Sequence, residues 1–365
     1  MSTDPAITQF FQNPHMIKGT ENFKEDDGEM SCQSEPLTIK SPGNISGLSL
    51  SHSPNQIDIE FERLMDYIKE KDVFEMTEAV KQNLRHFSAT DNRLYTSSIN
   101  FINLHKLWGT YYPEKGDFEL AENRAHALVE HREDFEWLYN ILKDYRSKRI
   151  LVNILCYWLM SDTKRIGQIY EKTFSQYFDL DIVKCDENEV FVDIGAYIGD
   201  TVVNYSKVFG KNCYKRMYCY EIVPANIEYI EKNVELFKLD DVIIRKKGAS
   251  NRNGTMYLSS NVLSSISQLS DKGAIAVPIT KVDDDIEENV TFIKMDIEGG
   301  EEEALLGCLA KIREGHPKFA LSIYHNHKDI WKLARIIYDV DPSYNFYIRY
   351  YGSTIFPTEY VLYAV

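Results

Sequence analysis

A turn with two glycines follows an apolar run near the middle of the chain, in the segment EVFVDIGAYIGDT at residues 189–201. The apolar run is typical of a strand that is buried on both faces of a parallel sheet. Gly195 and Gly199 carry no side chain that would keep a ligand away from the backbone. In open α/β sheets ligands bind at the carboxyl ends of the strands, where this turn is expected to lie. The segment therefore predicts a ligand-binding loop, with Ala196, Tyr197 and Thr201 beside the two glycines.

Carboxylates surround this turn and indicate which ligand it binds. Glu221 ends the next expected strand, where it can bind both hydroxyls of a ribose. Asp193 and Asp200 flank the turn and would repel a pyrophosphate, and the glycine spacing differs from the G-x-G-x-x-G of dinucleotide-binding folds. The pattern favours a cationic nucleoside without phosphate, and S-adenosylmethionine fits this description. The structural alternative is that Asp200 only caps a helix and Gly195 only turns the chain.

A second acidic group follows a later apolar run, in the segment FIKMDIEGG at residues 292–300. Asp296 and Glu298 are expected at the same edge of the sheet as the glycine turn. Two carboxylates there can orient an acceptor hydroxyl, hold a divalent cation such as Mg²⁺, or act as a base. Alternatively, Glu298 caps the following helix and Asp296 binds loop amides.

His325 directly follows the strand-like run FALSIY, with His327 two residues later. An imidazole at this edge of the sheet can remove a proton from an acceptor hydroxyl. A structural histidine bonded to a loop carbonyl is nearly as good an interpretation. Two histidines spaced in this way are weak support for a metal site.

The elements that must position these residues form an alternation of strands and helices typical of a doubly wound parallel sheet. Seven strands are predicted at residues 190–194, 217–220, 242–246, 292–295, 319–324, 346–350 and 359–363, the last two as an antiparallel pair. Helices are predicted at residues 201–209, 224–236, 301–312 and 329–338. Residues 186–365 are therefore expected to form one α/β domain.

Two different segments precede this domain. Residues 1–55 contain five of the eleven prolines and a stretch rich in Ser, Gly and Asn, so we expect a largely disordered tail. Residues 56–185 show apolar positions at steps of three and four, which predict a helical region that covers the site or recognises the acceptor.

Composition excludes several function classes. The formal net charge of -15 disfavours a general nucleic-acid binder, because such proteins neutralise phosphates with Lys and Arg. No run of about 18 apolar residues predicts a membrane span, and the first residues lack the pattern of a secretion signal. The six cysteines form no CxxC pair, so a zinc finger is disfavoured and a reducing cytoplasmic location is expected.

Three motifs in this order resemble the FkbM family of methyltransferases: VDIGAYIGDT, YEIVPANIEYIEKNV and FIKMDIEGGEEEAL. The resemblance covers roughly residues 175–365 and implies a Rossmann-like class I methyltransferase sheet that uses S-adenosylmethionine. It also implies O-methylation of a sugar or another hydroxyl compound, as in polysaccharide biosynthesis. Carried over by position, it places the methionine part of the cofactor on the turn at 193–199, the ribose at Glu221, and the adenine near Gly248, Ala249 and Ser250.

The sequence therefore predicts an O-methyltransferase for a sugar or glycan precursor, with Asp296, Glu298 and His325 facing the acceptor and Asp296 also beside the cofactor. One alternative is a scaffold protein that keeps this fold without turnover. Another is an NAD-linked enzyme, which the missing glycine pattern disfavours. The acceptor, the metal requirement and the oligomeric state are left open.

Overall fold

The computed structural model describes residues 54–106, 108–258, 269–270 and 275–365. The tail predicted over residues 1–55 lies outside this range, except for its last two residues. In the described part of the chain, no helix combines the length and the apolar character that crossing a membrane requires.

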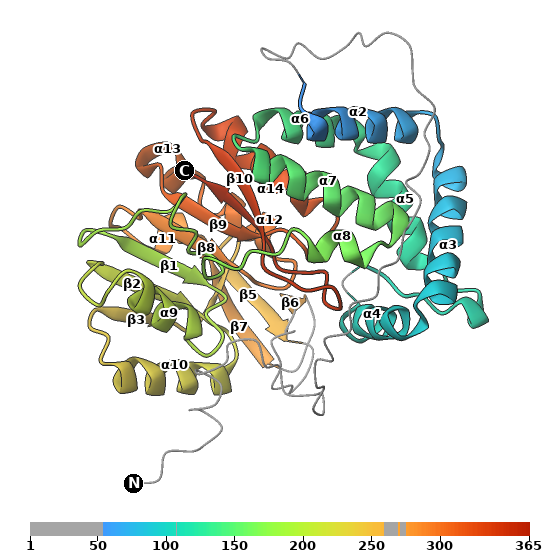
Figure 1. Ribbon diagram of the computed structural model, residues 1–365. Coiled ribbons are helices and arrows are strands. Elements are labelled where there is room, and N and C mark those ends of the chain that lie inside the picture. Colours follow the sequence, from blue (N-terminus) through green and yellow to red (C-terminus); the bar gives the residue numbers. More distant parts are fainter. Residues whose placement is uncertain (1–53, 107, 259–268, 271–274) are drawn as a thin grey trace. The chain divides into compact units, whose positions relative to one another are not determined.

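A seven-stranded sheet with the order β10-β11-β9-β8-β1-β2-β3 forms the centre of the described structure (Figure 1). Its strands are β1 (Val190–Ile194), β2 (Arg216–Tyr220), β3 (Val242–Arg245), β8 (Phe292–Met295), β9 (Lys318–Ser322), β10 (Phe346–Tyr350) and β11 (Tyr360–Ala364). Strands β3, β2, β1, β8 and β9 are parallel, and β11 is antiparallel to both β9 and β10. The predicted α/β fold class, with its antiparallel last pair, is confirmed.

Burial explains why most of these segments could be recognised, although β3 is only partly buried. Every residue of β1, β8 and β11 is buried. Strands covered on both faces have continuous apolar runs, which stand out in a sequence. The carboxyl ends of β1, β2, β8 and β9 meet at one edge, where the predicted site residues follow their strands.

Six helices accompany the sheet: α9 (Asp200–Val208), α10 (Pro224–Phe237), α11 (Val282–Asp285), α12 (Glu301–Leu306), α13 (Leu309–Gly315) and α14 (Asp329–Val340). The prediction of one helix over residues 301–312 is wrong. The helix is interrupted after Leu306, and a second helix begins at Leu309. At the break, a Cβ on Gly307 would lie 2.0 Å from the carbonyl oxygen of Ser250. Asp283 then accepts the backbone N–H groups of Ala310 and Lys311, which caps the new helix.

A second, smaller sheet was not predicted. It has the order β4-β7-β5-β6, with β4 (Gly248–Ala249), β5 (Gly254–Leu258), β6 (Leu269–Ser270) and β7 (Ile275–Thr280). Two of its strands have only two residues, and β7 contains Pro278, which normally argues against a strand. The sequence signal for these strands is therefore weak.

Residues 56–167 are largely helical, as predicted, but the predicted helical region extended to residue 185, and residues 168–185 contain turns and irregular segments but no helix. The helices are α2 (Gln56–Lys69), α3 (Val73–Thr90), α4 (Asn92–His105), α5 (Glu119–Glu130), α6 (Arg132–Ile141), α7 (Tyr145–Met160) and α8 (Thr163–Gly167), with a 3₁₀ turn η1 (Pro113–Lys115). In Figure 1 they extend from the β10 end of the sheet, and α7 packs against β10. The buried guanidinium of Arg349 in β10 joins the two parts, because it forms ion pairs of 2.7 Å with both Asp144 and Asp179.

Candidate active site

The predicted glycine loop lies between the ends of β1, β2 and β8. The backbone N–H groups of Gly195 and Ala196 both donate to the carbonyl oxygen of Tyr220, at 3.1 and 3.0 Å. Gly195 has a φ of 81°, and a Cβ at this position would lie 2.0 Å from the carbonyl oxygen of Asp296. Only glycine allows this approach. The loop after β1 and the acidic loop after β8 therefore touch, as the sequence predicted from their common sheet edge.

An ion pair beneath the loop fixes its position. Lys294 in β8 is buried, and its Nζ lies 2.9 Å from Asp193 Oδ1 and donates to the carbonyl oxygen of Gly195 at 2.8 Å. Burial raises the pKa of Asp193 to about 6 against the opposing effect of Lys294. The carboxylate is thus held in the wall of the site by one internal cation.

The other predicted cofactor residues of this loop continue into α9. Gly199, with a φ of 81°, is the N-cap residue of α9, and Asp200 and Thr201 begin the helix. Tyr197 has a left-handed φ of 47° and a side chain that is 38% exposed. An exposed aromatic ring on this loop is free to contact a ligand.

Glu221 lies directly after β2 and is 7% exposed. Its Oε1 accepts the backbone N–H groups of Ile222 and Val223, both at 2.8 Å, which fixes the carboxylate at the sheet edge. Burial raises its pKa, while these hydrogen bonds oppose the increase. The sequence placed Gly248 and Ala249 near an adenine, and both are buried in β4 of the second sheet.

Asp296 is fixed as a carboxylate by partners from distant parts of the chain. Tyr177 Oη donates to its Oδ2 at 2.8 Å, and Tyr324 Oη donates to its Oδ1 at 3.1 Å. Burial opposes ionisation, but Lys294 and His325 outweigh it and lower the pKa of Asp296. Asp296 is therefore ionised at neutral pH.

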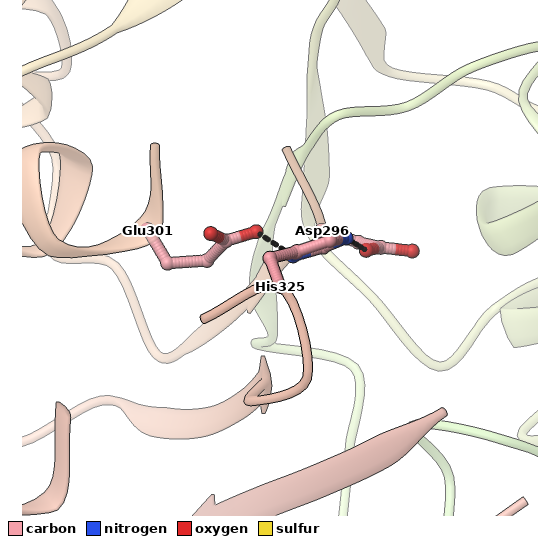
Figure 2. A group of neighbouring side chains, drawn as sticks. All are labelled: Asp296, Glu301 and His325. Atoms are coloured by element: carbon pink, nitrogen blue, oxygen red, sulfur yellow. Dashed lines mark ion pairs between the residues drawn. The ribbon is translucent and has the colours of Figure 1, made fainter. Parts of the chain in front are cut away.

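His325 lies between the carboxylates of Glu301 and Asp296 (Figure 2), and Glu298 is a third carboxylate near the ring. Its Nδ1 is 2.8 Å from Glu301 Oε1, and its Nε2 is 3.5 Å from Asp296 Oδ1 and 3.6 Å from Glu298 Oε2. Glu298 has a left-handed φ of 59°, a conformation that costs energy in a non-glycine residue. Glu301 accepts the backbone N–H groups of Ile297 and Gly299, at 2.8 and 3.0 Å. The buried Glu301 thus holds both the histidine and the loop that carries Glu298.

The three predicted catalytic residues differ in their pKa shifts and therefore in their charge at neutral pH. Burial lowers the pKa of His325, but Glu301, Asp296 and Glu298 overcome this effect and raise it to about 10. Burial, with Asp296 and Glu301, raises the pKa of Glu298 to about 8 against the influence of His325. At neutral pH His325 is therefore an imidazolium, and Glu298 titrates closest to neutrality.

A metal site was considered at Asp296, Glu301 and His325. Among the described residues, these three have possible ligand atoms that all lie within 4.8 Å of one another. Their contacts are with one another: His325 Nδ1 faces Glu301, and Nε2 faces Asp296. Glu301 already accepts two backbone N–H groups. The arrangement is explained by internal ion pairing and gives no support to a divalent cation.

Several site residues were missed by sequence reasoning. Glu301 was taken as the start of a helix, although its position at a helix N-terminus after two glycines was a usable signal. Tyr177 comes from the segment before β1, and Glu359 lies just before β11, where Gln176 Nε2 donates to its Oε2 at 2.6 Å. Burial and Asp296 raise the pKa of Glu359. No local pattern marks Tyr177 or Glu359.

Comparison with known proteins relates this architecture to methyltransferases. Residues 193–350 match the methyltransferase FkbM domain family. A crystal structure of methyltransferase FkbM from Methylobacillus flagellatus KT is similar, with a TM-score of 0.58, 24% identity and coverage of 67% of this chain and 62% of that chain. This chain thus corresponds to less than two thirds of that protein.

Two other solved structures have lower TM-scores and lower sequence identities to this chain. An rRNA methylase from Streptococcus thermophilus has a TM-score of 0.31 and 12% identity, with coverage of 56% of this chain and 93% of that one. A putative methyltransferase from Streptococcus mutans in complex with SAH has a TM-score of 0.32 and 11% identity, with coverage of 50% and 91%. No curated protein matches the sequence.

Proposed function

We propose that this chain, which matches the methyltransferase FkbM domain family over residues 193–350, transfers a methyl group from S-adenosylmethionine to a hydroxyl of a sugar or glycan precursor. The observation that carries the proposal is the contact between the two loops of the site. Gly195 of the cofactor loop lies against the backbone of Asp296 in the acidic loop. A donor on the first loop and an acceptor at the second would therefore be adjacent.

The residues present fit S-adenosylmethionine. Asp193, Asp200, Glu221 and Asp296 give the crevice a negative charge that suits a cation, and Lys294 is already paired. Glu221 would hold the ribose hydroxyls, and the turn at Gly195–Gly199 would receive the methionine part. Bound there, S-adenosylmethionine supplies an electrophilic methyl group on a positively charged sulfur.

The acidic loop contains the carboxylates that would remove the proton of the acceptor hydroxyl and orient the acceptor. As a hydroxyl attacks, it loses its proton, and a base with a pKa near the working pH removes it most effectively. The sequence favoured His325 for this role. With the pKa of Glu298 at about 8 and that of His325 at about 10, we assign proton removal to Glu298. The imidazolium of His325 stabilises the Glu298 carboxylate, and Asp296 orients the acceptor.

A binding measurement tests the cofactor assignment. Isothermal titration of the full chain with S-adenosylhomocysteine should show binding, and Glu221→Ala should weaken it by roughly 10-fold or more because charge-assisted hydrogen bonds to the ribose are lost. Glu231→Ala, on the exposed surface of α10, is the matched control and should bind as the wild type does. Absence of binding to the wild-type chain at millimolar ligand would overturn the proposal.

A second measurement separates an enzyme from a scaffold that keeps the fold. Glu298→Gln should retain S-adenosylhomocysteine binding but lose at least about 100-fold in the rate of methyl transfer from radiolabelled S-adenosylmethionine. The acceptor is found first by screening neutral and acidic sugars for label incorporation. We also propose a cytoplasmic location, with which the five free thiols in the described part of the chain are compatible.

A further inference from the structure

A buried guanidinium without a carboxylate partner lies in the helical part of the chain. Arg124 in α5 is 1% exposed, and none of the described carboxylates forms an ion pair with it. Removing a charge from water is costly unless the charge is paired and hydrogen-bonded. The surroundings of Arg124 therefore have to supply something that compensates for its burial.

The contacts that Arg124 makes within the described part of the chain compensate for only part of this cost. Its Cζ lies 4.7 Å from the ring centroid of Tyr157 and 6.0 Å from that of Trp108, and Nη1 donates to Ser161 Oγ at 3.4 Å. Aromatic rings attract the charge, but they do not replace hydrogen-bond acceptors. Nε and Nη2, which share one edge of the guanidinium, have no hydrogen-bond partner among the described residues. Two neighbouring N–H donors on a guanidinium suit an anion.

Other buried polar atoms without a hydrogen-bond partner lie near Arg124. They are Trp158 Nε1 in α7, Tyr360 Oη in β11 and His327 Nε2 in the loop after β9. The rings of Trp158 and His327 lie 4.5 Å apart. The charge of Arg124 contributes to lowering the pKa of His327 and opposes the increase in the pKa of Tyr360, so both side chains lie within reach of this charge. Atoms from four different elements thus share one unsatisfied region.

This region contains more hydrogen-bond donors than acceptors. The guanidinium and the indole N–H of Trp158 can only donate. Burial, and secondarily Tyr157, raise the pKa of Tyr360, so its hydroxyl keeps its proton. Burial, and secondarily Arg124, lower the pKa of His327 to about 3, so its ring is neutral and adds no charge. The region therefore holds one positive charge and a surplus of donors.

An anion satisfies such a group of donors better than water does. A water molecule that accepts from these donors must also place its own two hydrogens, and the region offers few acceptors for them. An anion accepts from every donor and also compensates for the charge of the guanidinium. The unpartnered atoms are shielded from solvent, so the ligand must be small enough to be enclosed. A nucleotide or a sugar acid does not meet this condition.

We infer that Arg124, Trp158 and Tyr360 enclose a small inorganic monoanion of the chloride type, held by Nε and Nη2 of the guanidinium. The inference goes beyond the proposed methyl transfer and does not depend on it. Bound there, the ion joins α5 and α7 of the helical region to β11 of the α/β domain. Its binding should therefore stabilise the fold.

Thermal unfolding of the full chain in sodium chloride and in sodium gluconate, at equal ionic strength, tests the inference. Chloride should raise the melting temperature of the wild type by roughly 2 °C or more, and the effect should saturate. Gluconate is too large to be enclosed and serves as the reference anion. Arg124→Met should remove the difference between the two salts. Lys115→Met, which removes an exposed positive charge in η1, is the matched control and should keep the difference.

Tyr360→Phe is a milder second variant, and it decides the question if Arg124→Met does not fold. Loss of one hydrogen bond to the ion should raise the chloride concentration at half of the effect by about 3-fold or more. In gluconate the variant should melt no lower than the wild type, because it loses a buried hydroxyl without a partner. Tyr347→Phe, at a partly exposed tyrosine of β10, is the control and should respond to chloride as the wild type does.

Direct binding is measured by the broadening of the ³⁵Cl NMR line, which the wild type should produce and Arg124→Met should not. Equal melting temperatures of the wild type in the two salts would overturn the inference, because water and the aromatic rings would then be sufficient. A chloride effect that rises without saturation would overturn it as a general effect of salt. An unchanged chloride response in Arg124→Met, or in Tyr360→Phe where Arg124→Met does not fold, would also overturn it.

Discussion

Glu301 and His325 form a buried pair in which Oε1 of the carboxylate lies 2.8 Å from Nδ1 of the ring. Figure 2 shows Asp296 on the opposite side of the imidazole. The pair leaves Nε2 directed at Asp296 and Glu298, the two carboxylates that we place beside the acceptor. Glu301 is thus a positioning residue that acts through His325.

Glu301→Gln should reduce the rate of methyl transfer by roughly 10-fold or more and leave the affinity for S-adenosylhomocysteine unchanged. The charge of Glu301 is the first of the effects that raise the pKa of His325, so this pKa should fall in the variant. NMR titration of the His325 ring measures that change, which a purely structural role would not produce. Glu302→Gln is the control, since Glu302 pairs with Lys328 and Lys332 at the surface. Equal rates in both variants would contradict the assignment.

The stability of the protein should decrease as the pH rises from about 6 to about 9. The folded pKa of Glu298, about 8, and that of His325, about 10, both lie above their unfolded values. The folded state therefore holds more protons in this range, and stability is lost as they dissociate. Each such group contributes a slope of roughly 1 kcal/mol per pH unit between its two pKa values. Urea unfolding at several pH values measures the slope, which should be shallower in Glu298→Gln. A slope that Glu298→Gln does not alter would show that Glu298 is not one of these groups.

Gly195→Ala should abolish S-adenosylhomocysteine binding and destabilise the protein. The new Cβ meets the backbone of Asp296 at 2.0 Å, and the residue has a φ of 81°. Gly210→Ala is a matched control, because Gly210 also has a positive φ, of 100°, but a Cβ there meets nothing within 4 Å. The control should lose only about 1 kcal/mol from backbone strain and should bind normally. Calorimetric titration and urea unfolding of both variants separate steric contact from strain. Equal losses in the two would contradict the contact.

Lys294→Met should lower the free energy of unfolding by about 3–5 kcal/mol, because it leaves the Asp193 carboxylate buried without its cation. Adding Asp193→Asn should recover part of this loss, since the double variant contains no buried charge at this position. Lys246→Met breaks the exposed pair with Glu231 and should have little effect. Urea unfolding of the wild type, Lys294→Met, Asp193→Asn and the double variant measures the coupling. An additive double variant would show that the two residues do not interact.

Local sequence patterns predicted the strands that carry the site. The run that contains Asp193 and the run before Asp296 both become fully buried strands, and Gly195 and Asp296, which follow these strands, lie at the expected edge. Lys294, in the run before Asp296, is buried and pairs with Asp193 in the neighbouring strand. These features depend on neighbours in the sequence or on the rule that parallel strands end together.

The small sheet containing β5 and β7 and the break at Gly307 were not predictable in this way. Strand β7 includes a proline, and β4 has only two residues. The break depends on the backbone of Ser250, which is distant in the sequence. Neither feature changes the local periodicity of apolar residues, on which the predictions relied.

The sequence by itself determined the type of sheet, the glycine turn and the carboxylates at its edge. Only the tertiary structure decided the protonation states of the carboxylates and of His325. Asp296 stays ionised because the fold brings Lys294 and His325 close to it, and Tyr177, 119 positions earlier, also donates to it. His325 becomes cationic because Glu301 is turned toward it. The reason is physical: periodicity reports whether a side chain is buried, but its pKa depends on which charges and donors the fold brings within a few ångströms of it.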